Sequence, residues 1–221
     1  MVRQAARRFL AKQIALGTLE HTAWDSVDAS VVDTPEHRAL ALEAATQSIV
    51  LLRNEHISTG GASVRALPLK RASKLAFIGP HADSTVEMLG NYHGVNIQVL
   101  NRTVKDTARQ QNLDFKYSDG TDVAAAVTIA KGADTAVLFL GLTEINEGEG
   151  HDRKSLELPP AQMALATAVV AAQPHTILVL INGGALAVEA LITGNHPIPG
   201  MACSVPCTFP LMLLCFFNRW R

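Results

Sequence analysis

The sequence predicts an α/β fold in which a mainly parallel sheet is covered by helices. Several segments combine an unbroken apolar run with β-branched or aromatic residues, which is typical of strands buried on both faces. The predicted strands are 74–80, 134–140 and 176–182, with a weaker alternating strand at 113–117. Helical segments at 122–131 and at about 159–172 separate the later strands. Strands that alternate with helices in this way favour parallel pairing.

Two further helices are predicted before the first of these strands. Residues 1–16 place apolar side chains at helical spacing and are followed by a glycine. The second helix starts at Thr34, a suitable N-cap, with Pro35 at the first helical position. The apolar run at 48–54 fits either the last turn of this helix or a short strand. The pair Gly60-Gly61 then marks a loop.

Composition and charge exclude several classes of protein. Apolar residues make up 48% of the chain, which indicates a globular rather than a disordered protein. The net charge is −1, with 19 basic and 20 acidic residues, so no nucleic-acid partner is expected. No apolar run reaches the length of a membrane span, and the basic N-terminal residues lack the apolar core of a signal peptide. We therefore expect no membrane partner.

The sequence also gives no sign of a metal or a cofactor. Its three cysteines, Cys203, Cys207 and Cys215, lie in the last 20 residues without a histidine at ligand spacing. An odd number so placed favours neither a disulfide framework nor a zinc site. The turn Gly79-Pro80-His81 resembles phosphate-binding turns, but neither a Gly-x-Gly-x-x-Gly pattern nor a Walker lysine follows it.

An acidic loop follows the central predicted strand. Glu144, Glu147 and Glu149 fall within six residues, and Asp152 and Arg153 close the loop after them. Interspersed glycines allow the backbone to turn tightly. Because ligands collect at the carboxyl ends of strands in open α/β sheets, chemistry is expected in this loop. A solvated acidic loop without chemistry is the alternative.

Several ordered motifs resemble those of the C-terminal α/β-sandwich domain of family 3 glycoside hydrolases, in particular the β-xylosidase branch. They are Leu42–Asn54 with Ala66–Leu69, Ala76–Ala82, Gly90-Asn91-Tyr92-His93-Gly94, Glu149-Gly150-x-Asp152-Arg153 with Leu156-x-Leu158-Pro159-x-x-Gln162, and Ile177–Leu180 with Asn182-Gly183-Gly184. The resemblance covers roughly residues 5–192. It implies an incomplete (α/β)6 sandwich, preceded by a remnant helix of a (β/α)8 barrel.

The resemblance implies retaining hydrolysis of β-linked sugars, with an oligosaccharide such as a β-xyloside or β-glucoside as substrate. In this mechanism a carboxylate nucleophile attacks the anomeric carbon, and a carboxylic acid protonates the leaving oxygen. The family places the nucleophile on the barrel and the acid/base glutamate on the sandwich domain. Glu149 is the first candidate for this acid/base because it holds the motif position, Glu147 is the second, and Glu144 is the third. The candidates for substrate binding are Asn91, Tyr92 and Arg153, although Arg153 paired with Asp152 is the structural alternative.

The same resemblance divides the chain into three parts. Residues 1–34 correspond to the last barrel helix and a linker, residues 35–192 to a partial sandwich, and residues 193–221 to an atypical tail rich in proline and cysteine. We expect the tail to come from out-of-frame or intronic sequence. A barrel needs roughly 200 residues or more, so we expect the nucleophile to be missing and the chain alone to be inactive. Family members are commonly secreted, but the chain itself leaves its localisation open.

Two other functions are compatible with the sequence. The chain is alternatively a non-catalytic binding or interaction module that docks a partner through the face meant for the barrel. A flavodoxin-like nucleotide binder is the third and weaker hypothesis.

Overall fold

The computed structural model describes residues 1–86 and 102–204, and the chain divides into two compact units. The first unit is Met1–Ala41 and the second is Leu42–Arg221. The helices that begin in the first unit are α1 (Val2–Ala15), the short 3-10 helices η1 (Ala23–Ser26) and η2 (Ala29–Val31), and α2 (Pro35–Ser48). Both helices predicted from the sequence here are confirmed.

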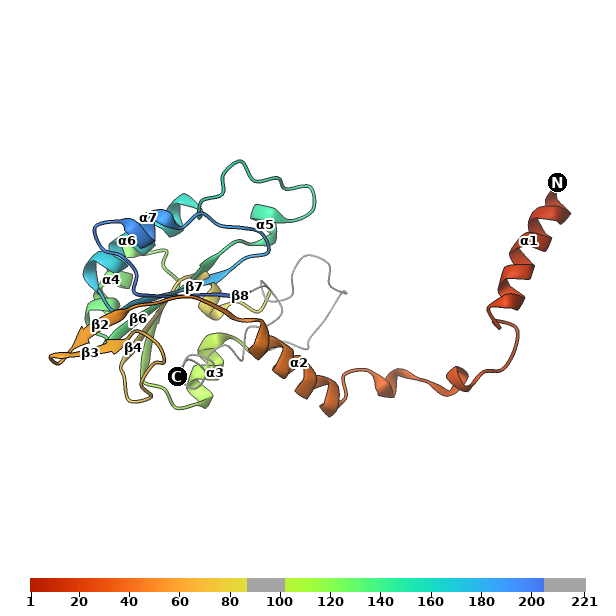
Figure 1. Ribbon diagram of the computed structural model, residues 1–221, viewed down its shortest axis with the longest axis horizontal. Helices are drawn as coiled ribbons and strands as arrows, with labels where there is room; N and C mark the ends of the chain where they lie inside the picture. The colour runs from red at the N-terminus through yellow and green to blue at the C-terminus, as the bar shows by residue number, and fades with distance from the viewer. Residues whose placement is uncertain (87–101, 205–221) are drawn as a thin grey trace. The chain divides into compact units, whose positions relative to one another are not determined.

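The second unit is built on a six-stranded sheet (Figure 1). In spatial order its strands are β1 (Val50–Asn54), β8 (Gly200–Ser204), β7 (Thr176–Ile181), β6 (Thr135–Gly141), β4 (Leu75–Ile78) and β5 (Phe115–Ser118). Strand β1 pairs antiparallel with β8, whereas the other four pairings are parallel. The sheet is therefore mainly parallel, as the sequence predicts.

Helices cover both faces of this sheet (Figure 1). The helices that begin in this unit are η3 (Pro80–Asp83), α3 (Val104–Gln110), α4 (Val123–Lys131), α5 (Glu144–Glu147), α6 (Pro160–Ala172) and α7 (Glu189–Thr193), of which α5 buries no residue. Residues of α4, α6 and α7 pack on one face, and residues of α3 pack on the other. The parallel strands thus lie between two apolar layers, which explains their continuous apolar sequences.

Strand β6 shows how the two layers are filled. Phe139 points to the α3 side, where its ring lies 5.2 Å from that of Phe77 in an edge-to-face contact. Leu138 and Leu140 point to the side of α4 and α6. Burial of each such side chain stabilises the fold by about 1.5–3 kcal/mol. The strand is therefore fixed in register, and so is the loop that leaves it.

The structure resolves the ambiguous segment at 48–54 and adds elements that the sequence did not predict. Its residues form strand β1 after the end of α2. The loop predicted at Gly60-Gly61 is the turn of a separate hairpin, β2 (His56–Thr59) with β3 (Ala62–Arg65). The two glycines have φ values of +58° and +81°, which suits a tight two-residue hairpin turn. Within the described residues, no helix is both long and apolar enough to cross a membrane.

The predicted end of the sandwich at residue 192 is too early for the sheet. Strand β8 lies beyond it and pairs with β7 on one side and with β1 on the other. Its sequence, Gly-Met-Ala-Cys-Ser, has no β-branched residue and follows a proline-rich segment, so no local pattern indicates a strand. The ladders on both of its sides stabilise it instead.

Candidate functional site

The candidate site begins where β6 ends, at Gly141. This residue has a φ of +155°, and a Cβ placed on it would lie 1.7 Å from the carbonyl oxygen of Ile181 in β7. Only glycine allows the two backbones to approach so closely. The side chain of Gln162 holds the same residue, because its Oε1 accepts from Gly141 N at 2.9 Å and its Nε2 donates to Gly141 O at 3.0 Å. The acidic loop therefore leaves the sheet from a fixed point.

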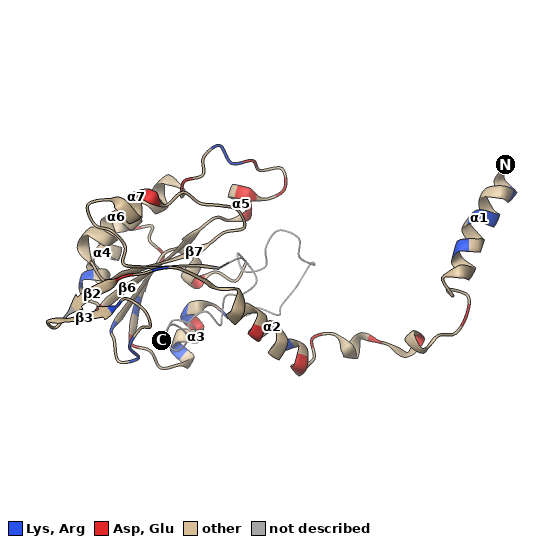
Figure 2. Cartoon of the chain, viewed as in Figure 1, with Lys and Arg blue, Asp and Glu red and all other residues tan. Residues whose placement is uncertain are grey.

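A short helix then starts the acidic loop. Thr143 caps α5 together with Asn146, whose Oδ1 accepts from Thr143 N at 3.0 Å. Gly148 ends the helix, and its N–H donates to the carbonyl oxygen of Glu144 at 2.7 Å. His151 Nδ1 lies 3.2 Å from the same oxygen. Figure 2 shows acidic positions on α5 and along the loop after it, with basic positions farther along.

Glu147 is held by the loop that follows β7. Its Oε1 accepts a hydrogen bond from Gly183 N at 2.6 Å, and its Oε2 accepts one from Gly184 N at 3.1 Å. The carboxylate is 20% exposed and also lies 3.7 Å from Nε of Arg153. The second candidate for the acid/base is therefore engaged by protein groups on both of its oxygens.

Glu149 is placed differently. Its side chain, between Gly148 and Gly150, is exposed to solvent. Gly150 has a φ of +79°, which turns the chain directly after it. Glu144, the third candidate, is half-buried at the start of α5. Of the three glutamates, Glu149 is thus the one presented outward from the carboxyl end of β6.

The candidates for substrate binding fall into two groups. Arg153 belongs to the internal contacts of the loop, since its Nη1 donates to the carbonyl oxygen of Ala185 at 3.0 Å and its Nε faces Glu147. The ion pair expected with Asp152 is replaced by this pair, and Asp152 is exposed. Asn91 and Tyr92 lie outside the described residues.

The sequence assigned no role to the residues that hold this loop in place. Gly183 and Gly184 bind Glu147, and Gln162 binds Gly141. Both belong to motifs visible in the sequence, but these contacts join residues that are 21 to 37 positions apart. Local patterns do not reveal such pairs.

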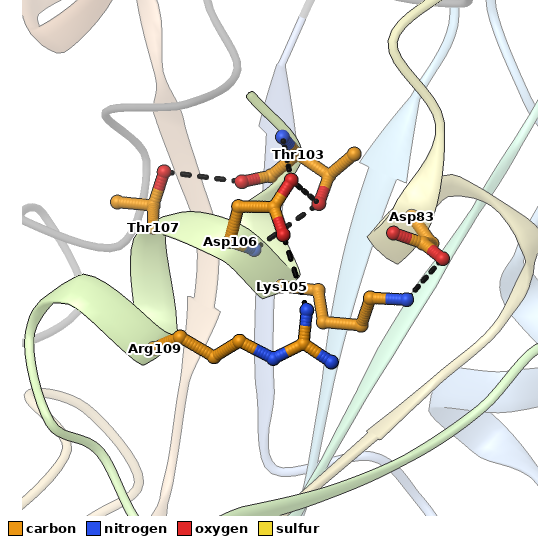
Figure 3. Close-up of polar contacts among 6 residues, drawn as sticks. All are labelled: Asp83, Thr103, Lys105, Asp106, Thr107 and Arg109. Carbon is orange, nitrogen blue, oxygen red and sulfur yellow. Dashed lines mark hydrogen bonds and ion pairs between the residues drawn. The ribbon is translucent and has the colours of Figure 1, made fainter. Parts of the chain in front are cut away.

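A second polar cluster lies beyond the ends of β4 and β5 (Figure 3). Lys105 pairs with Asp83, and its Nζ lies 4.6 Å from the centre of the Tyr117 ring. Burial is the largest cause that raises the pKa of Tyr117, and the charges of Asp83 and Asp119 raise this pKa further. Thr103 and Asp106 form the capping box that starts α3. These contacts fix α3 against the sheet.

Among the described residues, no group of three or more His, Cys, Asp or Glu side chains is placed to hold a metal ion.

The buried histidine next to the site predicts a pH-dependent stability. His81 is 2% exposed, and burial lowers its pKa from 6.5 to about 4, against an opposing effect of the Gly141 backbone. Protonation of His81 therefore favours the unfolded chain. The contribution of the neutral histidine to the free energy of unfolding is fully present above pH 6.5 and is lost as the pH falls toward 4. We expect a loss of about 2 kcal/mol between pH 7.5 and pH 5 from this group. Urea denaturation at both pH values measures it, and an equal loss in His81→Gln would contradict it.

Comparison with known proteins places this geometry in context. Residues 49–200 match the model of the glycosyl hydrolase family 3 C-terminal domain. A probable β-D-xylosidase 7 of Arabidopsis thaliana is 35% identical over 181 residues, which is 78% of this chain and 23% of the relative. A probable exo-1,4-β-xylosidase xlnD of Neosartorya fischeri is 34% identical over 185 residues, which is 80% of this chain and 23% of that relative.

The fold of this chain is also similar to that of a solved structure. The GH3 β-glucosidase of Bifidobacterium adolescentis aligns with a TM-score of 0.70 and 28% identity, covering 88% of this chain and 29% of that one. The chain thus spans about a quarter of the length of the relatives it matches.

Proposed function

Because this chain belongs to glycosyl hydrolase family 3, we propose that it carries the acid/base half of a retaining exo-β-glycosidase site. The substrate class is a terminal β-xyloside, with β-glucosides as the alternative, since relatives of both names match. Glu149 is the general acid that protonates the leaving oxygen, and afterwards the base that activates water. The observation that carries this function is the exposed Glu149 at the carboxyl end of β6, on a loop fixed at both ends.

The partner carboxylate is supplied from outside the described fold. A retaining mechanism requires a nucleophile about 5–5.5 Å from the acid/base group. Within the described residues, the carboxylates nearest along the chain are Glu147, which binds backbone amides, the exposed Asp152, and Glu144 at the start of α5. A (β/α)8 barrel domain therefore provides the nucleophile, and residues 1–34 are the last helix of such a barrel with its linker. Residues 35–192, extended by strand β8, then form an incomplete (α/β)6 sandwich. Asn91 and Tyr92 contribute to the sugar site, and Arg153 contributes to its wall through its contacts with Ala185 and Glu147.

The purified 221-residue chain is expected to show no turnover of p-nitrophenyl β-D-xyloside above that of buffer. One carboxylate of a two-carboxylate mechanism cannot both attack the anomeric carbon and protonate the leaving oxygen. Release of p-nitrophenol, followed by absorbance, measures the rate. A rate comparable to that of the Neosartorya fischeri relative would contradict the division of the site between two domains.

Activity is expected when the missing half is supplied. In a chimera, the matched residues of this chain replace the aligned 185-residue segment of the Neosartorya fischeri relative. This chimera is expected to hydrolyse xylobiose, and it serves below as the background for single substitutions. A folded but inactive chimera, with circular dichroism like that of the relative, would argue against an acid/base role for this loop.

A non-catalytic interaction module is the second candidate function. It is favoured by large apolar side chains that are exposed in the first unit, among them Phe9 at 64% and Trp24 at 79%. Exposed apolar surface of this kind marks either an interaction site or a liability to aggregate. Size-exclusion chromatography with light scattering separates the two cases, since a defined oligomer supports the module and polydisperse material argues against it.

A further inference from the structure

The loop that carries Glu149 is fastened at two points to the loop that follows β7. The first point is the carboxylate of Glu147, which accepts hydrogen bonds from the consecutive N–H groups of Gly183 and Gly184 at 2.6 and 3.1 Å. Successive backbone N–H groups that converge on one anion form a nest, and hydrogen bonds to an ionised acceptor are about twice as strong as neutral ones.

The second point is Arg153. Its Nη1 donates to the carbonyl oxygen of Ala185 at 3.0 Å, and its Nε lies 3.7 Å from Oε2 of Glu147. The two charged side chains are only 18% and 20% exposed, so each is costly to leave without the other. Farther along, Ala187 N donates to the carbonyl oxygen of Leu156 at 2.7 Å, which extends the contact between the two loops.

The glycines at 183 and 184 provide the space that these contacts need. A Cβ at Gly183 would lie 3.1 Å from Oε1 of Glu147, and a Cβ at Gly184 would lie 2.7 Å from Nη2 of Arg153. Asn182 shapes the same turn, because its Nδ2 donates to the carbonyl oxygen of Gly184 at 2.5 Å. The sequence Asn-Gly-Gly after β7 is thus fitted to receive a carboxylate and a guanidinium from the neighbouring loop.

We propose that Glu147 and Arg153 form a latch that positions the acid/base loop, so that Glu147 is a positioning residue and not the proton donor. The latch rests on the proposed function, because it holds Glu149 between its two points of attachment. Both oxygens of Glu147 face groups that can only donate. A proton on either oxygen would meet another donor and would have no route to a substrate oxygen.

A matched pair of variants tests the latch in the 221-residue chain without any assay of activity. Glu147→Gln replaces one accepting oxygen with an NH2 group that faces a backbone N–H, whereas Glu149→Gln changes only an exposed side chain. Hydrogen exchange is expected to accelerate about 10- to 100-fold in residues 143–153 and 183–187 for Glu147→Gln. It is expected to stay unchanged for Glu149→Gln and for the exposed control Glu157→Gln. Equal exchange in all three variants would overturn the latch.

Gly184→Ala tests the same latch while both charges remain in place. The added methyl group displaces the guanidinium of Arg153, whose flexible end can move without disturbing the sheet. The variant is expected to accelerate exchange in the same two segments as Glu147→Gln does. Unchanged exchange in Gly184→Ala would mean that the close approach of Arg153 to this turn does not hold the loop.

The chimera separates positioning from proton donation. In Glu147→Gln we expect kcat on xylobiose to fall about 10-fold or more. Its KM, its single-turnover rate of glycosylation by 2,4-dinitrophenyl β-xyloside and the basic limb of its pH–rate profile are all expected to be kept. If Glu147→Gln only damaged the folded structure, the rates on xylobiose and on 2,4-dinitrophenyl β-xyloside would fall equally. If Glu147→Gln lost the basic limb of its pH–rate profile, Glu147 would be the proton donor and the latch would be overturned. A different outcome separates the two proposals. If Glu149→Gln keeps the basic limb, while hydrogen exchange accelerates in Glu147→Gln as predicted, then Glu149 is not the proton donor and the latch is still supported.

Discussion

Glu149→Gln in the chimera is expected to lower kcat on xylobiose by about 10²- to 10⁴-fold, the usual contribution of a general acid. The leaving sugar is a poor leaving group and needs its oxygen protonated as the bond breaks. A 2,4-dinitrophenolate leaves without protonation, so glycosylation by 2,4-dinitrophenyl β-xyloside is expected to be nearly unaffected. The ratio of the two rates, measured under single-turnover conditions, is the readout.

The basic limb of the pH–rate profile gives a second readout on the same variant. A general acid must be protonated to act, so the rate falls as the pH rises above its working range. Glutamine cannot titrate, and the basic limb is expected to vanish in Glu149→Gln. Glu157→Gln, which removes an exposed carboxylate outside residues 143–153, is the matched control and is expected to match the parent chimera on both substrates. A basic limb that survives in Glu149→Gln would remove Glu149 from the mechanism.

Gly141→Ala is expected to destabilise the 221-residue chain by about 4 kcal/mol, more than most single substitutions do. The residue has a φ of +155°, and the new Cβ would lie 1.7 Å from O, 2.6 Å from C and 2.9 Å from N of Ile181. These are backbone atoms of β7, so they cannot move without breaking the ladder between β6 and β7. The midpoint of urea denaturation measures the loss.

Gly150→Ala is the control for the conformational part of this effect. Gly150 also has a positive φ, +79°, but nothing lies within 4 Å of the position that a Cβ would take. Its substitution is expected to cost only about 1–2 kcal/mol, the usual strain of a left-handed residue. Equal losses for the two alanine variants would mean that the close approach of β6 to β7 at Gly141 does not carry the effect.

The parts of the fold that the sequence predicts are those determined by local pattern. Strands β6 and β7 lie between two apolar layers, and their unbroken apolar runs reveal this directly. Strand β8 lacks such a signal, since Gly-Met-Ala-Cys-Ser is held by ladders on both sides and not by its own propensity. The hairpin of β2 and β3 was missed for a related reason, because its strands are short and largely exposed.

The candidate site, like the fold, has one part that the sequence predicts and one part that only the structure shows. The sequence places three glutamates in one loop after β6 and ranks Glu149 first by its motif position, but it does not show which glutamate binds other groups of the protein. The structure separates them by their partners, since Glu147 binds amides 36 and 37 positions away while Glu149 faces solvent. Contacts between distant segments depend on the packing of the whole sheet, so a local motif cannot reveal which glutamate is engaged.

Azide rescue of the chimera tests most directly which glutamate is the acid/base. With 2,4-dinitrophenyl β-xyloside, a variant without its acid/base residue still forms the covalent xylosyl intermediate but hydrolyses it slowly. Azide needs no general base, so it is expected to accelerate turnover of Glu149→Ala and to yield β-xylosyl azide, identified by NMR. No azide product is expected from Glu147→Ala. The azide product from Glu147→Ala, and none from Glu149→Ala, would contradict the assignment of the acid/base and of the latch together.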